Sequence, residues 1–256
     1  MSHLITEHQE QVCLITFNRT EKHNAFDDHV LRDLQQVLQT AIEDTQVRVI
    51  VLKAHGKHFS AGADLAWMQR MANFSEQENV DDALILAKLM HTLHHSPKPT
   101  IAMVHGAAMG GGAGLVAACD IAIAASSARF CFSEVKLGLI PAVISPYVIK
   151  AIGERAANCL FMTAETFDAN RAKELHLVHQ VVPDSELLAY TLNYAEQLAK
   201  LPGAAVQDAK ALVRYVAEQK LDEKLLQSTA TLIAKKRVSA EGQKGLQAFL
   251  NKEKNR

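Results

Sequence analysis

The stretch MGGGAG at residues 109–114 constrains the fold of this chain more than any other feature. Its three consecutive glycines follow the apolar run PTIAMVHGAA and precede LVAACDIAIAA. This pattern predicts a buried strand, a tight turn and a helix that begins near Gly111. Glycine is needed where the backbone turns sharply or where another group approaches it closely. We therefore expect either a packed sheet or a ligand to lie against this turn.

The glycine turn does not fit a nucleotide-binding loop. A dinucleotide fingerprint would need a third glycine at Leu115, and a phosphate loop would need lysine and a hydroxyl residue at Gly112 and Ala113. The unpaired backbone N–H groups at the start of a helix nevertheless attract negative charge, including a developing oxyanion. Close packing of the helix on the sheet explains the glycines equally well at this point.

A second stretch, GKHFSAGADLAWM at residues 56–68, has the same organisation. The strand VIVLKAHG leads into a short turn rich in glycine and alanine, and an apolar helix begins after Asp64. Asp64 suits the helix N-terminus, where its carboxylate complements the helix dipole. If the two turns converge, one N–H from each can hold a single carbonyl oxygen.

Composition limits the class of protein. The chain has 256 residues, of which 48% are apolar and 21% charged, enough for the core of one large domain or of one domain with an appendage. The formal net charge of −1 provides no overall attraction to nucleic acid or to an anionic membrane. The N-terminus does not resemble a signal peptide, and no run of about 18 apolar residues predicts a membrane span. We expect neither nucleic acid nor a membrane as a partner.

Strands and helices alternate in the first part of the chain, and helices dominate the last part. Strand patterns cover 3–17 as a hairpin, 47–56, 99–106 and 120–126. Helix patterns cover 24–45, 79–94, 111–118 and almost everything after 183. These patterns predict an α/β core at residues 1–196, followed by a helical C-terminal region at 197–256.

Cysteine and histidine spacing gives no metal site. His91 and His95 share a helix face, but Thr92 stands where a zinc protease motif needs glutamate, and no third ligand follows at zinc spacing. The cysteines lie far apart among apolar neighbours, as expected for reduced thiols in a cytoplasmic protein. They are Cys13, Cys119, Cys131 and Cys159.

Four motifs in this order resemble the enoyl-CoA hydratase/isomerase, or crotonase, superfamily. They are NRTEKHNAF (18–26), HFSAGADL (58–65), the long stretch from KPTIAMVHG to LGLIP (98–141) and AFLNK (248–252). The resemblance implies an α/β fold, a crotonase-like spiral of ββα repeats with a helical C-terminal trimerisation region. It also implies acyl-CoA thioester substrates, homotrimers or dimers of trimers, and no cofactor, since coenzyme A is part of the substrate.

The resemblance also implies catalytic roles. The N–H groups of Ala63 and Gly111 would form an oxyanion hole for the thioester enolate. Hydratases of the family usually carry two glutamates, of which the second maps to Glu134 and the first to Gly114. Apolar neighbours of Glu134 would raise its pKa towards that of a useful general acid and base. Asp120 more closely fits a structural acceptor of backbone donors.

A single carboxylate leaves two reactions open. Glu134 can move a proton between two carbons, which is isomerisation, or it can both activate a water molecule and return its proton, which is hydration. A polar group of the substrate can also hold the water. GADLAWMQ together with SEVKLGLIPAVISPYVIKAIGERAA resembles the bacterial methylglutaconyl-CoA hydratases of leucine and isovalerate breakdown, and therefore favours hydration. A non-catalytic acyl-CoA binder or an RNA-binding module is the alternative of another class.

The same resemblance assigns binding residues. The acyl chain and thioester are expected against the two turns, the helix after Asp64 and the loop PAVISP at 141–146. Trp67 and Met68 fit an ordinary helix core equally well. A second carboxylate on the acyl chain predicts a cation near the pocket, and Lys136, two residues after Glu134, would lie on the same side if that segment is extended. A lysine in such a place is more often simply solvated. The predicted substrate-binding residues are Ala61, Gly62, Asp64, Leu65, Trp67, Met68, Gly110, Gly114, Lys136, Pro141, Val143 and Ile144. The predicted CoA-binding residues are Lys22, His23, Ala25, Phe249 and Lys252, the last two acting in a neighbouring subunit's site.

Overall fold

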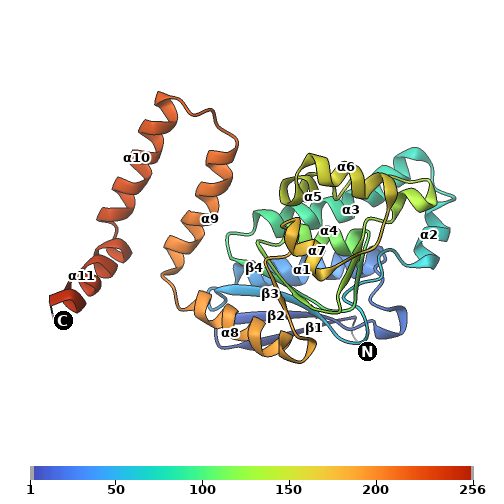
Figure 1. The fold of residues 1–256 in the computed structure, drawn as a ribbon, viewed down its shortest axis with the longest axis horizontal. Coiled ribbons are helices and arrows are strands. Elements are labelled where there is room, and N and C mark those ends of the chain that lie inside the picture. Colours follow the sequence, from blue (N-terminus) through green and yellow to red (C-terminus); the bar gives the residue numbers. More distant parts are fainter. Residues whose placement is uncertain (1–2, 255–256) are drawn as a thin grey trace. The chain divides into compact units, whose positions relative to one another are not determined.

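The computed structural model describes residues 3–254, and Figure 1 shows its elements coloured along the chain. The chain divides into two compact units, Met1–Leu198 and Ala199–Arg256, which are described separately below. The first unit contains all the strands of the described residues and both glycine turns. The second contains helices.

A six-stranded sheet forms the centre of the first unit. Its order is β1-β2-β3-β4-β6-β9, with β1 antiparallel to β2 and every other neighbouring pair parallel. All residues of β2, β3 and β4 are buried, as expected of strands covered on both faces. The six strands are β1 (Leu4–Gln9), β2 (Val12–Phe17), β3 (Val49–Ala54), β4 (Thr100–Val104), β6 (Ile121–Ala125) and β9 (Gln180–Val182).

A smaller three-stranded sheet carries the glycine turn. It consists of β5 (Ala107–Met109), β7 (Arg129–Cys131) and β8 (Phe167–Asp168), in that order. The chain passes from β4 to β5 to helix α4 (Gly111–Ala118), and then from β6 to β7 to the 3-10 helix η2 (Glu134–Leu137) and α5 (Ser145–Ile152). These successive turns of two strands and a helix confirm the predicted ββα spiral.

Helices cover the sheets by burying one face each. Helix α1 (Asp28–Glu43) buries a stripe at helical spacing that includes Leu31, Leu34 and Leu38, and it packs against α3 (Glu76–His95). Its predicted start at residue 24 was wrong. Asn24 has a φ of 54°, Phe26 lies in a β-bridge, and the helix is capped by Asp27. The other helices of this unit are α2 (Leu65–Met71), α6 (Glu154–Thr163), α7 (Ala169–Glu174), α8 (Leu187–Ala199), η1 (Thr20–Lys22) and η3 (Asp184–Glu186).

The second unit consists of α9 (Gly203–Ala217), α10 (Glu223–Val238) and α11 (Ala240–Lys254). The Glu241 carboxylate accepts hydrogen bonds from the N–H groups of Ala204 and Ala205 and pairs with the Lys236 ammonium at 3.3 Å. This carboxylate therefore joins the start of α11 to the start of α9 and the end of α10. Large apolar side chains are exposed on all three helices, among them Val213, Leu232, Ile233, Leu246 and Phe249.

Candidate active site

The turn between β5 and α4 leaves an open helix N-terminus. Gly110 has a φ of 49°, which favours glycine, and its N–H donates to the Cys131 carbonyl at 2.8 Å. Within the described part of the chain, no side chain caps α4. Among the described residues, no acceptor takes the hydrogen bond of the Gly111 N–H. This N–H is therefore available to a ligand at the positive end of the helix dipole.

The second turn runs beside the first. Ser60 and Ala108 form a parallel β-bridge, in which the Ser60 N–H donates to the Ala107 carbonyl and the Met109 N–H donates to the Ser60 carbonyl, both at 3.0 Å. Gly62 has a φ of 96°, and a β-carbon there would lie 3.2 Å from the Met109 carbonyl oxygen. The backbones of the two turns are therefore in contact just before Ala63 in one turn and Gly111 in the other.

The Ala63 N–H points away from the segment around Phe26, which pairs with the turn. Phe26 forms a parallel bridge with Ala63, since the Phe26 N–H donates to the Gly62 carbonyl and the Asp64 N–H donates to the Phe26 carbonyl, both at 2.8 Å. In such a bridge the intervening residue directs its own N–H to the opposite side. Among the described residues, that N–H has no acceptor, and Ala63 is exposed.

Glu134 lies against the glycine turn. A β-carbon at Gly110 would lie 3.3 Å from the Glu134 Oε1 atom, so the carboxyl group packs directly against this glycine. The Oε2 atom is buried and has no hydrogen-bond partner among the described residues. Burial raises the pKa of Glu134 above its ordinary value, as predicted from its apolar neighbours. A carboxyl group with raised pKa and an unpaired oxygen suits proton transfer.

Apolar side chains fill the space beside α4. A β-carbon at Gly114 would lie 2.2 Å from Ile144 Cγ2 and 3.1 Å from Met90 Cε, and one at Gly111 would lie 3.1 Å from the Phe26 ring and 3.6 Å from Leu86 Cδ2. Ile144 thus occupies the volume that a side chain at position 114 would need, the position to which the resemblance maps the first glutamate of other hydratases. Leu86 and Met90, four residues apart on α3, were not predicted at this site. Their apolar helical spacing was the available signal.

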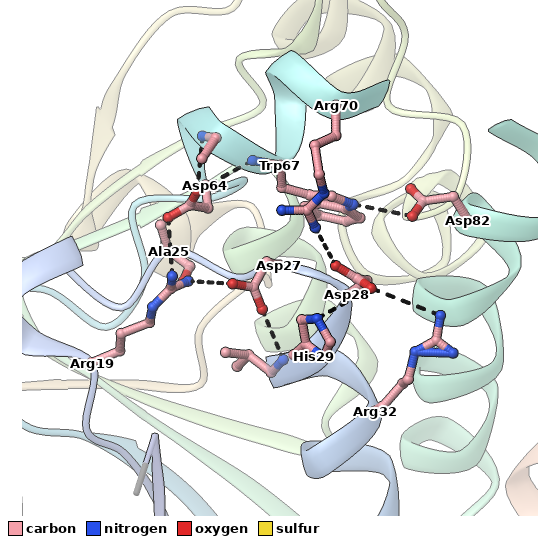
Figure 2. Close-up of polar contacts among 12 residues, drawn as sticks. Arg19, Ala25, Asp27, Asp28, His29, Arg32, Asp64, Trp67, Arg70 and Asp82 are labelled. Atoms are coloured by element: carbon pink, nitrogen blue, oxygen red, sulfur yellow. Dashed lines mark hydrogen bonds and ion pairs between the residues drawn. The ribbon is translucent and has the colours of Figure 1, made fainter. Parts of the chain in front are cut away.

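Asp64 holds the start of α2, as predicted. Its Oδ1 atom accepts the N–H groups of Ala66 at 2.8 Å and Trp67 at 3.2 Å, and its Oδ2 atom lies 3.2 Å from the Arg19 guanidinium. Figure 2 shows these contacts together. Trp67 is 6% exposed and donates its ring N–H to Asp82 at 3.0 Å, so it packs in the core between α2 and α3.

The residues predicted to bind the acyl group differ in exposure. Leu65 is 76% exposed, whereas Met68 is half-buried. In the loop after η2, Pro141 and Ile144 are buried and Val143 is half-buried against the core. Ile144 lies against α4 at Gly114, and its role in substrate binding stays a prediction.

The prediction for Lys136 assumed an extended segment, and that assumption was wrong. Residues 134–137 form a 3-10 helix with about three residues per turn, so side chains two apart do not share a face. The Lys136 ammonium lies 3.9 Å from the Cys131 thiol instead.

Three of the predicted CoA-binding residues lie around the turn that precedes Ala63. The Lys22 ammonium lies 3.8 Å from Asp64, and the His23 carbonyl accepts the Ala61 N–H at 3.0 Å. The Ala25 carbonyl accepts a hydrogen bond from Arg19 at 3.0 Å.

In the second unit, Phe249 is 63% exposed on α11, while the side chain of Lys252 lies outside the described residues.

The Asp120 carboxyl group is a structural acceptor, as expected, and His91 and His95 lie on one face of α3. The Asp120 carboxylate accepts the Thr100 N–H at 2.8 Å, which makes it a structural acceptor. The rings of His91 and His95 stack at 4.0 Å. Within residues 3–254, three or more metal-ligating side chains do not gather anywhere in a group that could hold an ion. No helix in the same range combines the length and the apolar character needed to cross a membrane.

Comparisons with known proteins agree on one family. The enoyl-CoA hydratase/isomerase family profile matches residues 7–256. A solved structure of an enoyl-CoA hydratase/isomerase (crotonase) from Legionella pneumophila is 64% identical, with a TM-score of 0.95 over 98% of this chain and 97% of that one. An enoyl-CoA hydratase from Thermus thermophilus is 34% identical over 94% of this chain and 95% of its own length. The 2,3-dehydroadipyl-CoA hydratase of Escherichia coli is 33% identical over 98% and 97%. This chain belongs to the enoyl-CoA hydratase/isomerase family.

Proposed function

We propose that this protein is a hydratase that adds water across the 2,3 double bond of a branched unsaturated acyl-CoA, with 3-methylglutaconyl-CoA as substrate. One observation carries the proposal. The Glu134 carboxyl group lies against Gly110, with a buried and unpaired oxygen, next to two backbone N–H groups that have no acceptor among the described residues. This arrangement suits proton transfer beside a thioester whose oxygen gains charge.

In the proposed reaction one carboxylate handles both protons. Glu134 takes a proton from water as the water oxygen bonds to C3 of the acyl chain. The electrons of the double bond move onto the thioester oxygen, which the Ala63 and Gly111 N–H groups stabilise. Glu134 then returns the proton to C2, and the thioester carbonyl forms again. One water molecule is consumed, and no other reactant is needed.

The apolar surroundings of Gly114 support the proposal that the substrate itself helps to hold the water molecule. The apolar groups of Ile144 and Met90 fill the space beside Gly114, the position to which the first glutamate maps. A carboxylate on the acyl chain would supply the polar contact with the water molecule. The methyl branch of the acyl chain would pack against the apolar side chains of Ile144 and Met90. The name of the Escherichia coli relative points to a similar chemistry, because an adipyl chain also ends in a carboxylate. The pocket residues predicted above, apart from Lys136, remain our candidates for contacts with the acyl chain.

The proposal extends to assembly and location. We propose a homotrimer, or a dimer of trimers, in which Phe249 and Lys252 complete the CoA site of a neighbouring subunit. The exposed apolar side chains of α9, α10 and α11 support burial of this unit in an assembly. We also propose that the protein acts in the cytoplasm on acyl-CoA alone, without a further cofactor.

A panel of CoA thioesters in oxygen-18 water tests the proposed reaction. The panel contains 3-methylglutaconyl-CoA, glutaconyl-CoA without the methyl branch, crotonyl-CoA without the second carboxylate, and a 3-enoyl-CoA. The proposal predicts the highest kcat/KM for 3-methylglutaconyl-CoA, with one oxygen-18 atom in the product. Migration of the double bond without oxygen uptake would instead establish an isomerase. Binding of every thioester without turnover of any would establish a binding module.

A further inference from the structure

Arg19 makes three contacts around the turn that carries Ala63. Its guanidinium lies 3.0 Å from Asp27 Oδ2 and 3.2 Å from Asp64 Oδ2, and it donates to the Ala25 carbonyl at 3.0 Å. The side chain is only 13% exposed. Figure 2 shows the guanidinium between the chain before α1 and the start of α2. Arg19 therefore joins two segments that are far apart in the sequence.

These contacts flank the backbone pairing of the proposed oxyanion donor. Ala25 and Asp27 stand on either side of Phe26, and Asp64 directly follows Ala63. Phe26 is the residue whose N–H and carbonyl hold the peptides on both sides of Ala63, at 2.8 Å each. The guanidinium thus connects the same two segments that the Phe26 bridge joins. Loss of Arg19 would remove the guanidinium contacts on both sides of that bridge.

The backbone of Arg19 is itself anchored to the same turn. Its N–H donates to the Asn24 side-chain oxygen at 2.9 Å. The Asn24 amide in turn donates to the carbonyls of His55 at 2.8 Å and His58 at 2.7 Å. Asn24 is buried, and His55 and His58 lie on the chain that leads from β3 into the turn. Arg19 is thus fixed at both its main chain and its side chain.

Arginine suits this place because one planar group must serve three acceptors. The two carboxylates it meets already use their other oxygens to cap helices. Asp27 Oδ1 accepts the Val30 N–H at 2.9 Å, and Asp64 Oδ1 accepts the Ala66 N–H at 2.8 Å. A guanidinium presents its donors in a fixed fork, whereas a lysine ammonium is a compact charge that cannot reach all three acceptors with the same geometry.

We infer that Arg19 is a positioning residue, which holds the Ala63 peptide so that its N–H meets the thioester oxygen. The inference rests on the proposed function, because it requires the Ala63 N–H to be an oxyanion donor. Arg19 acts through Asp64 and through the segment around Phe26. It therefore affects the polarisation of the thioester and the rate of the chemical step more than the affinity for CoA esters.

The test compares wild type with Arg19→Met, which keeps much of the side chain's length and removes its charge and its donors. The probe is butyryl-CoA labelled with carbon-13 at the thioester carbonyl, a saturated ester on which neither hydration nor isomerisation can act. Isotope-edited infrared spectra report the carbonyl stretch of the bound probe, which falls when hydrogen bonds polarise the carbonyl. Calorimetry gives the Kd of the probe, and thermal unfolding gives the Tm. Kinetics use the best substrate of the panel above.

Arg70→Met is the matched control. The Arg70 guanidinium also links α2 to α1, through Asp28 at 2.5 Å, but it is about half exposed and does not contact Asp64. The inference predicts that Arg19→Met loses most of the wild-type shift of the carbonyl stretch and lowers kcat by about 10- to 100-fold. The Kd of butyryl-CoA should change by less than about 3-fold, since uniform binding is retained. Arg70→Met should keep the wild-type stretch and kcat.

Arg19→Lys covers the case in which Arg19→Met does not fold. Because lysine keeps the charge but not the fork, its carbonyl stretch and kcat should fall between those of wild type and Arg19→Met. A wild-type stretch and kcat in either folded Arg19 variant would overturn the inference while leaving the proposed function intact. Absence of any shift in bound wild type would instead contradict the oxyanion hole, and the role of Arg19 would fall with it.

Discussion

Ile144 occupies the space that a side chain at position 114 would need, and Gly114 is therefore required by packing. The β-carbon of any other residue there would come within 2.2 Å of Ile144 Cγ2. Ile144 is 2% exposed and belongs to the core, so it has little room to move. The absence of an acidic side chain at position 114 thus depends on the packing of Ile144, which lies 30 positions further along the chain.

This coupling predicts a double-mutant result. Gly114→Ala alone should destabilise the protein by about 1 to 3 kcal/mol, because the added methyl overpacks the core. Ile144→Ala alone should cost about 2 to 5 kcal/mol by opening a cavity. The double variant should be more stable than the sum of the two costs implies, since each change relieves the other. Urea unfolding of the four proteins gives the interaction energy.

Gly245→Ala is the control for that experiment. Gly245 is a helical glycine of α11, and none of the described residues places an atom within 4 Å of an added β-carbon there. Alanine should stabilise the helix there by about 0.5 to 1 kcal/mol. If Gly114→Ala behaved like Gly245→Ala, the packing of Ile144 against α4 would be refuted.

Glu134 should also lower stability at neutral pH. Burial raises its pKa above the ordinary 4.5, so the folded protein binds this proton more tightly than the unfolded chain does. Stability is therefore lost as the pH rises from the unfolded pKa through the folded pKa. Glu134→Gln lacks this titration. As the pH rises above about 4.5 and Glu134 of the wild type ionises, the Tm of Glu134→Gln should rise relative to that of wild type. Tm profiles that stay parallel would speak against the burial of a titrating carboxyl group.

Asp64 combines a helix cap with the ion pair to Arg19, and two substitutions separate these roles. Asp64→Ala removes both, while Asp64→Asn keeps an oxygen for the cap. The free energy of unfolding of the alanine variant should fall by about 0.5 to 2 kcal/mol through loss of the cap. It should fall further because the largely buried Arg19 guanidinium has fewer partners. The asparagine variant should lose only the second part.

Asp222 provides the comparison for Asp64. Its Oδ1 atom caps α10 through the Leu225 N–H at 2.9 Å, and the residue is exposed. Asp222→Ala should show the cost of a cap alone, and Asp222→Asn should lie close to wild type. Urea unfolding measures all four variants. Equal losses in Asp64→Asn and Asp222→Asn would show that the charge of Asp64 adds nothing.

The sequence predicted the elements that depend on local pattern. Buried runs such as 99–106 gave strands, and α4 starts and ends where the glycine turn and apolar run placed it. The sequence did not show contacts that depend on long-range packing. Arg19 lies within the quoted motif NRTEKHNAF, but no spacing rule connects it to Asp64. The 3-10 turn at Lys136 was missed because a segment of four residues carries no periodic signal.

The most direct test of the proposed chemistry is the turnover of 3-methylglutaconyl-CoA by wild type and by Glu134→Gln. Glu165→Gln, at an exposed glutamate of the same unit, serves as the control. The account predicts that Glu134→Gln binds the thioester with nearly unchanged Kd but loses about 100-fold or more in kcat, because it can no longer transfer the proton. Glu165→Gln should match wild type. A kcat for Glu134→Gln within about 3-fold of wild type would contradict the central role of this carboxyl group.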